Sequence, residues 1–333
     1  MGRRESSLRS KDKESRERCQ AIGREVRIVH HREGEYPRVL NSPYAKLVEC
    51  DANRVLVGIL NRSHADVPLS DKRVRQALNL AVDCQKVIEQ GLGGYANPVC
   101  ALTPSWCGGF PADAQPYPHD LGRAKQLLDE VGWPSGRNLR LAAPAPFAGI
   151  AQLVAGDITA ALGIDVDIML VPLEKMLAGA RALAEKKLSL PWDMLITGWF
   201  DLSSEAPPAA VHREFFGSDG AFRAGPELPA FDELYTEMTR QLDGSKLVQA
   251  AEQIDRYVFE EALALFLCAP KALYAVNKHV SFGPYRTTFE LAEAEVDDEH
   301  WSRTKKEGQA FQAAPSPPSE PLRFVSGSSG NAC

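Results

Sequence analysis

The sequence contains little that would commit it to a covalent framework or to a metal site. Its 333 residues include seven cysteines, an odd number, and no two of them form a Cys-x-x-Cys pair. A dense disulfide framework and a zinc knuckle are therefore not expected. We expect most of the cysteines to be free or packed. A bridge between Cys100 and Cys107 across one loop stays open, because spacing alone does not decide it.

Long apolar runs and an excess of positive charge are also missing. No stretch approaches the roughly 18 apolar residues of a membrane span, so we expect no span. The first twenty residues, MGRRESSLRSKDKESRERCQ, are charged and contain no apolar core, unlike a secretory signal. The net charge of -6 gives no general attraction to nucleic acid or to an anionic membrane. We therefore expect no nucleic-acid partner.

The motifs of common enzymes and cofactor sites are absent as well. The sequence has no Walker A loop, no His-Glu-x-x-His and no Gly-x-Ser-x-Gly. The stretch GLGGYA (91–96) follows a helical pattern instead of a strand, so it is interpreted as a helix stop and not as a dinucleotide loop. His30 and His31 have no ligand partners at suitable spacing. We expect neither catalysis nor a bound cofactor or metal.

What the sequence does contain is an alternation of strand and helix patterns through most of residues 53–280, which favours an α/β layer architecture. Strands are predicted at NRVLVGILN, NLRLAAP, IDVDIML, WDMLITGWF and the apolar run ALALFLCAP. Besides the helix at 71–83, helices are predicted near 120–131, 150–162, 173–187, 227–242 and 246–263. The loop 96–118 is too long for a simple connection, so we expect it to be functional or to pack as a flap.

The stretch DKRVRQALNLAVD (71–83) predicts a core helix. Its apolar residues fall at helical offsets, with Ser70 as the expected N-cap and glycines from Gly91 onward as the expected stop. This apolar face consists of Val74, Ala77, Leu78, Ala81 and Val82. Three cations lie near its start, but the neighbouring residues are acidic or apolar. A solvated polar face is therefore favoured over a nucleic-acid-reading helix.

The same stretch, continued by GLGGYANP, resembles the most characteristic segment of the bacterial extracellular solute-binding proteins, family 5. These are the peptide, nickel and related receptors of ABC importers. The matching residues are Asn61, Pro68, Asp71, Arg73, Val74, Arg75, Gln76, Ala77, Leu78, Ala81 and Asp83. PYPHDLGRAKQLLDEVGWPSG, LGIDVDI, WDMLITGWFD and EALALFLCAPKALYAVNKHV then follow in the order of the family. The resemblance covers about residues 53–300.

The resemblance implies an α/β fold, specifically a periplasmic-binding-protein type II-like lobe in which helices flank a mixed sheet. It also implies a two-lobed clamshell that closes on a small ligand without catalysis. The implied partners are a peptide ligand and ABC permease subunits, and the implied location is extracytoplasmic. Only about 60 residues precede the characteristic helix, which the family has near mid-chain. We therefore expect a truncated clamshell that lacks most of the first lobe.

The expected organisation has five parts. A polar, disordered arm and a remnant of the first lobe with a hinge strand precede the second-lobe α/β domain. A return segment toward the first lobe and a disordered tail rich in Pro, Ser and Gly follow it. In chain order these parts span residues 1–35, 36–60, 61–275, 276–302 and 303–333.

The ligand-binding candidates are Trp199, Phe200 and Asp201. In peptide-binding members of the family, an aspartate after a Gly-Trp strand pairs with the α-ammonium group of the ligand, and these residues match that place. A carboxylate at a strand end beside two aromatic residues also suits a charge-assisted bond in a partly dry cleft. The alternative is an aspartate that caps a strand-to-loop turn. The Trp-to-Asp spacing is one residue short of some peptide binders, and SSEAPP replaces the usual Asp-Pro.

Two functional hypotheses follow. The first is a non-catalytic substrate-binding component of an ABC importer that binds peptides. The second is a cytoplasmic α/β protein-interaction domain derived from a solute-binding protein, without ligand transport. The absence of a signal in the given sequence and the polar N-terminal arm favour the second, and a chain expressed as given would be cytoplasmic. The ordered series of motifs favours the first.

Overall fold

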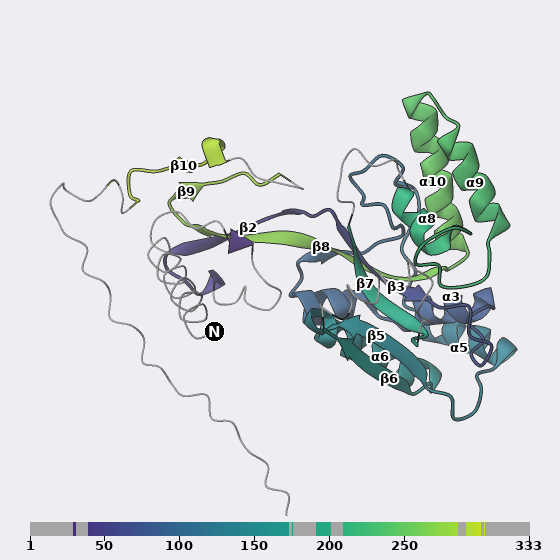
Figure 1. Ribbon diagram of the computed structural model, residues 1–333. Coiled ribbons are helices and arrows are strands. Elements are labelled where there is room, and N and C mark those ends of the chain that lie inside the picture. The colour runs from purple at the N-terminus through teal and green to yellow at the C-terminus, as the bar shows by residue number, and fades with distance from the viewer. Residues whose placement is uncertain are drawn as a thin grey trace, which may run out of the picture.

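A computed structural model describes residues 29–30, 39–172, 175, 191–200, 209–285, 291–300 and 303. Within these ranges the chain forms a helix-covered α/β lobe, at the right of Figure 1, and a smaller distal unit made of strands, at the left. The long strand β8 (Ala264–Asn277) runs through both. The helix predicted near 173–187 lies outside the described residues except for residue 175.

The α/β lobe is built on a mixed sheet with the strand order β6, β5, β7, β3, β8. Strands β6 (Val166–Val171) and β7 (Met194–Phe200) both run parallel to β5 (Leu139–Pro144). Strand β3 (Arg54–Leu60) runs antiparallel to β7 on one side and to β8 on the other. The strands predicted from the sequence are therefore all present in this sheet.

Strand β3 shows why the lobe has three layers. Val55, Val57 and Ile59 belong to one hydrophobic cluster, whereas Leu56 and Leu60 belong to another. Because successive side chains of a strand point to opposite faces, β3 contributes to two cores at once. A run without a polar residue is what a strand covered on both faces requires. The prediction of a buried strand here is confirmed.

Three helices cover one face of the sheet: α3 (Lys72–Ala81), α5 (Leu121–Val131) and α6 (Ala148–Leu162). The other face is covered by α8 (Ala210–Phe216), α9 (Pro229–Thr239) and α10 (Gly244–Glu260). Figure 1 shows the two groups of helices on opposite sides of the strands. Apolar periodicity predicted all of these helices except α8, because each has one face that must be buried against the sheet. The short α8 was not predicted from the sequence.

Strand β8 connects the lobe to the distal unit. Its first part pairs with β3, and residues 271–277 pair with β2 (Ala45–Asp51). Only two residues separate β2 from β3, so these strands follow one another along β8. Between the two pairings, Ala269 and Pro270 pair with the short β4 (Ala96–Asn97). The sequence analysis predicted a strand only at ALALFLCAP, but the structure continues it to Asn277 as one strand of 14 residues.

The distal unit has a small apolar cluster of its own. Besides β2 and the second half of β8, it contains β1 (Val29–His30), β9 (Val280–Ser281) and β10 (Glu295–Val296), with the one-turn helix η3 (Leu291–Glu293) before β10. The buried residues of this cluster are Ala272, Tyr274, Val276, Val280 and Phe282. Because this cluster shares no member with the two clusters of the lobe, the distal unit is a separate packing unit.

Helix α3 begins and ends differently from the prediction. Its N-cap is Asp71, whose side chain accepts a hydrogen bond from the Arg73 backbone N–H at 2.8 Å, so the prediction of Ser70 was wrong. Ser70 lies inside a turn that the Asp71 N–H closes on the Pro68 carbonyl.

The helix ends at Ala81, before the predicted glycine stop, and Val82 is extended. Asp83 then caps the short α4 (Cys84–Lys86), which continues into the π-helical turn η1 (Val87–Gly91). The glycines therefore end this second helical segment and not α3.

Arg75 is a buried residue, which corrects the expectation of a solvated polar face. Its side chain is 5% exposed and donates to the backbone carbonyls of Glu261 and Ala262, just beyond the end of α10. It also donates to the carbonyls of Leu69 and Ser70. The guanidinium group thus satisfies carbonyls that a helix end leaves without partners.

Asn79 attaches α3 to the central sheet. Its amide group donates to the Ala264 carbonyl and accepts from the Phe266 N–H, both at 3.0 Å. The other two cations of the helix lie at the surface. Lys72 pairs with Glu261, and Arg73 pairs with Asp71. Because Lys72 and Arg73 are about 40–45% exposed, their ion pairs contribute little to stability.

A buried carboxylate connects several segments at the end of the sheet where β5 and β7 begin. Asp193 has no exposed side-chain surface and lies 2.8–3.0 Å from His64, Arg137 and Arg140. Burial by itself raises the pKa of Asp193, but hydrogen bonds from Arg140 and His64 and the charge of Arg137 outweigh it and bring the pKa to about 2. This cluster, the Asp193 hub, ties the start of β7 to β5 and to the chain after β3.

One apolar segment is longer than the sequence analysis expected. Residues Ala145–Leu162 form a continuous helical stretch that is long and apolar enough to cross a membrane by length and composition alone. Ile150, Val154 and Ile158 in this stretch are buried in the core of the lobe. A core helix of a soluble protein passes the same test, and packing against the sheet accounts for the apolar character of α6.

Strand β6 departs from the predicted alternation. Ile164, two residues before the strand, is buried as expected, but Leu170 within the strand is 48% exposed. Among the described residues β6 is the edge of the sheet, and its side chains are covered only partly. The alternating pattern therefore identified the strand correctly but not the depth of each side chain.

We predict that Asn79→Leu destabilises the lobe by about 2–5 kcal/mol, because the Ala264 carbonyl and the Phe266 N–H would stay buried without partners. Urea unfolding of the full chain measures the loss. Gln85→Leu is the control, since Gln85 is exposed and its side chain bonds only to Glu89. A loss of similar size in both variants would contradict the role given to Asn79.

We predict that Asp193→Asn costs about 3 kcal/mol at neutral pH, because it leaves Arg137 and Arg140 without their buried partner. The folded pKa of Asp193 is about 2, below the ordinary 3.8. Its contribution to stability is therefore present above about pH 4 and is lost as the pH falls toward 2. Unfolding measured from pH 7 to pH 2.5 should show the two proteins converging, and a constant difference would refute this.

Candidate functional site

The carboxyl ends of parallel strands meet at one edge of the α/β lobe. Pro144 pairs with Val171 at the ends of β5 and β6, and β7 ends at the same edge with Phe200. Strand β3 runs the other way and begins there, with Arg54 opposite Phe200. In open α/β sheets, ligands bind in the crevice outside the carboxyl ends of the strands. We call this place, defined by these four residues, the carboxyl edge.

The predicted ligand-binding residues follow the course of β7. Trp199 and Phe200 are its last two residues and lie opposite Val55 and Arg54 in the register with β3. Their backbone is therefore at the carboxyl edge. The side chains of both residues, and the whole of Asp201, lie outside the described part of the chain. Their role in binding a ligand stays a prediction.

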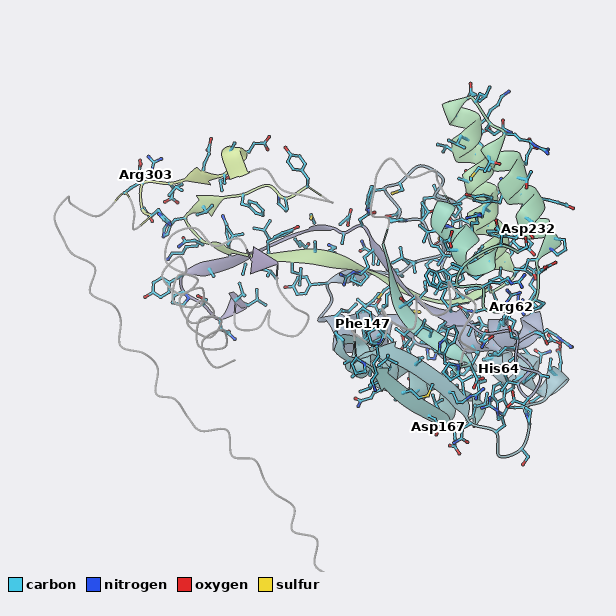
Figure 2. The ribbon with its side chains drawn as sticks, in the orientation of Figure 1. Arg62, His64, Phe147, Asp167, Asp232 and Arg303 are labelled. Atoms are coloured by element: carbon cyan, nitrogen blue, oxygen red, sulfur yellow. The ribbon has the colours of Figure 1, made fainter. Side chains whose placement is uncertain are left out.

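Gly198 allows close packing just inside the carboxyl edge. A β-carbon at this position would lie 3.4 Å from Cδ of Arg54 and 3.5 Å from Cζ of Phe147. The stem of Arg54 and the ring of Phe147 therefore lie over the glycine. Phe147 is the N-cap residue of α6, and Figure 2 shows it on the side of the lobe that faces the distal unit. A cation and an aromatic ring thus line the described part of this edge.

The long loop after β4 reaches the junction between the lobe and the distal unit. Trp106 donates from Nε1 to the carbonyl of Ala52 at 3.3 Å. Ala52 lies between β2 and β3, where the chain passes from the distal unit into the lobe. A small recess surrounds this contact, and its other lining residues are Asp51, Asn97, Pro104, Ser105, Ala269 and Pro270. The loop therefore packs against both strands that connect the two parts.

The same loop is attached to the helices behind it. Asp255 of α10 is fully buried, and its Oδ1 accepts from the Leu102 N–H at 2.8 Å and lies 2.9 Å from Nε2 of His212. His212 belongs to α8, the first described helix after Asp201. Asp255 thus joins the loop to both helices.

The sequence analysis missed the role of Asp255. The available signal was its spacing, because it falls among Ala251, Ile254 and Val258 on the apolar face of α10.

Neither a metal-binding cluster nor a surface depression on α9 contributes to the carboxyl edge among the described residues. Among them, no group of three or more His, Cys, Asp or Glu side chains is arranged to hold a metal ion. A shallow surface depression lies along α9, away from the carboxyl edge. It is lined by Ala230, Asp232, Glu233, Leu234, Thr236, Glu237 and Arg240. We assign it no role, because it is shallow and contacts none of the elements of the edge.

Comparison with known families gives a match over most of this architecture. Residues 19–220 match the model of the bacterial extracellular solute-binding proteins, family 5, middle region. The matched region includes the characteristic helix α3, the parallel strands and the carboxyl edge. It covers more than half of the chain, which agrees with the resemblance carried by the motif series.

Curated relatives match over shorter parts of their length. The "Probable di/tripeptide-binding protein 5" of Pseudomonas aeruginosa is 27% identical over 234 residues, which are 66% of this chain and 41% of that protein. Glutathione-binding protein GsiB of Salmonella choleraesuis is 35% identical over 69 residues, 21% of this chain and 13% of that protein. The chain therefore matches well under half of the length of these relatives.

Solved structures share the fold at low sequence identity. The ABC transporter substrate-binding protein CtaP from Listeria monocytogenes has a TM-score of 0.70 at 17% identity, covering 81% of this chain and 56% of that chain. The periplasmic binding protein DppA from Helicobacter pylori, in complex with the peptide STSA, has a TM-score of 0.65 at 18% identity. The match covers 81% of this chain and 52% of that chain.

These findings confirm the expected fold class, a mixed sheet with flanking helices of the periplasmic-binding-protein type II kind. Family and fold are those of non-catalytic, extracytoplasmic solute-binding proteins. By the match of its residues 19–220, the chain belongs to the bacterial extracellular solute-binding proteins, family 5.

Proposed function

We propose that the protein is the substrate-binding component of an ABC importer and that it binds short peptides at the carboxyl edge without catalysing a reaction. The observation that carries the proposal is the position of the end of β7. Its register with β3 places the backbone of Trp199 and Phe200 at the edge where ligands bind in such sheets, directly before Asp201.

The chemistry of the three residues suits the amino terminus of a peptide. The carboxylate of Asp201 would accept charge-assisted hydrogen bonds from an α-ammonium group. Two aromatic residues beside it in sequence would exclude water and strengthen that interaction. The described residues nearby, Arg54 and Phe147, add a cation and an apolar ring to the same edge. Together these groups favour a small ligand with both charged and apolar parts.

The names of similar proteins support a peptide over other solutes. One relative is named for di- and tripeptides and another for glutathione, and DppA was solved with a peptide. A second similar structure, NikA from Staphylococcus aureus, was solved with Ni(L-His)2. The described residues of this chain contain no cluster suited to a metal ion. A peptide is therefore the ligand that we propose.

The two connecting strands suggest how binding would be organised. In this proposal the distal unit belongs to the first lobe, and the passages at residues 52–53 and 269–270 form the hinge between the lobes. A ligand on the carboxyl edge would then be covered when the lobes close. The closed form would be the one that permease subunits recognise, outside the cytoplasm.

Calorimetric titration of the full chain with Ala-Ala and trialanine tests the proposal. We predict binding, and we predict that N-acetylation of the peptide weakens it at least about tenfold, because the α-ammonium group is lost. Asp201→Asn should weaken the free peptide by a similar factor and should leave the acetylated peptide nearly unaffected.

The matched control is Asp167→Asn, which removes a carboxylate from β6 near its amino end, opposite Arg140. Figure 2 shows Asp167 on the side of the lobe away from the distal unit. This variant should bind like the original protein. Failure of a folded sample to bind any of these peptides would refute the proposed ligand. Equal binding of free and acetylated peptides would refute the role of Asp201.

A further inference from the structure

A buried arginine lies at the end of the sheet opposite the carboxyl edge. Arg62 follows β3 by two residues, and its backbone N–H donates to the Ala224 carbonyl at 3.0 Å. The residue is 6% exposed, and its Nε and Nη2 atoms are buried without a hydrogen-bond partner in the described part of the chain. Figure 2 shows it on the far side of the lobe from the distal unit. Buried donors without partners are rare, because each costs free energy.

The charged groups that act on Arg62 do not neutralise it. Burial lowers the pKa of Arg62 to about 10, and the positive charges of Arg75 and Arg223 lower it as well, whereas the Tyr257 hydroxyl acts in the opposite direction. No carboxylate is among these groups. The guanidinium group is therefore a buried cation, and the two charges that lower its pKa besides burial are both positive.

The neighbouring carboxylates are engaged elsewhere. Glu261 lies 2.9 Å from Lys72 and 3.8 Å from the Arg75 guanidinium. Glu227 pairs with Arg223 at 3.3 Å and is itself 68% exposed. The donors of Arg75 are directed at backbone carbonyls. Two buried guanidinium groups thus share one end of the lobe.

Gly225 brings the backbone against the face of the Arg62 guanidinium. A β-carbon on Gly225 would lie 2.8 Å from both Cζ and Nη2 of Arg62. The face of the group is therefore covered by backbone. The two atoms without partners, Nε and Nη2, belong to one edge of the planar group, and their N–H bonds point in parallel. Such an edge is the fork with which arginine binds an anion through two hydrogen bonds.

We propose that the Nε–Nη2 edge of Arg62 binds a small monovalent anion inside the lobe. The anion accepts hydrogen bonds from these two donors, for which the described residues offer no acceptor, and it screens the repulsion between Arg62 and Arg75. It holds the chain just after β3 against the loop around Gly225. This site is separate from the carboxyl edge, because β3 begins at the one and ends at the other.

Bromide tests the proposal, because it replaces chloride and can be located by its anomalous scattering. Crystals of the full chain grown in sodium bromide should show an anomalous peak within hydrogen-bonding distance of Nε and Nη2 of Arg62. In solution, the melting temperature should be about 2–4 °C higher in sodium chloride or bromide than in sodium gluconate of equal ionic strength. Gluconate is too large for a buried site of this kind.

Arg62→Met should abolish this halide-specific difference, and Arg62→Lys should reduce it because a lysine has no two-donor edge. Arg256→Met is the control, because it removes another arginine of the same lobe. Arg256 lies on α10 and pairs with Asp113 and Glu252 at the surface. The control should keep the full difference. A bromide crystal with only water at Arg62 would overturn the proposal. So would an equal halide response in Arg62→Met and the original protein.

Discussion

The attachment of α3 to β8 is the interaction on which the α/β lobe depends. A sheet that is covered on both faces has no access to water, so each polar group that enters it needs a protein partner. Asn79 supplies two such partners to β8, and Arg75 supplies donors to the chain between α10 and β8. These two side chains connect α3 to β8 and to the end of α10, which lie far from α3 in sequence. Arg75, one of the residues that match the family pattern, therefore serves the packing of the core.

The two ends of the sheet differ in the contacts of their polar side chains. At the amino ends of β5 and β7, Asp193 forms ion pairs with Arg137 and Arg140 and a hydrogen bond with His64. The carboxyl ends have no comparable network among the described residues, and a glycine keeps the surface there thin. A held sheet end opposite the carboxyl edge would suit the ligand binding proposed above, because a binding lobe must keep its shape.

The regular parts of this fold could be predicted from the sequence because periodicity reports burial directly. The apolar run of β3 and the helical offsets of α3 both identified elements that the structure contains. The N-cap could not be assigned in the same way, because a turn from Pro68 takes Ser70 out of position and leaves Asp71 to cap. Nor could local spacing show that Arg75 reaches carbonyls 186 residues away.

For the candidate site, the pattern around Gly198 located the strand end, but no periodicity gives the position of a side chain in the loop that follows. The full length of β8 could likewise not be predicted from the sequence. Pro270 interrupts the sequence pattern without ending the strand, because the short β4 pairs with it there. Contacts between distant segments determine both the position of that side chain and the length of β8. Such contacts cannot be inferred from a single sequence.

The course of β8 also determines where the molecule yields mechanically. Between its pairing with β3 and its pairing with β2, the strand passes through Pro270, which has no amide hydrogen to donate. The ladder of backbone hydrogen bonds therefore lacks one donor at this crossing. In the proposed clamshell, closure would turn the two parts about this crossing, so that the separate packing of the lobe and of the distal unit could stay intact.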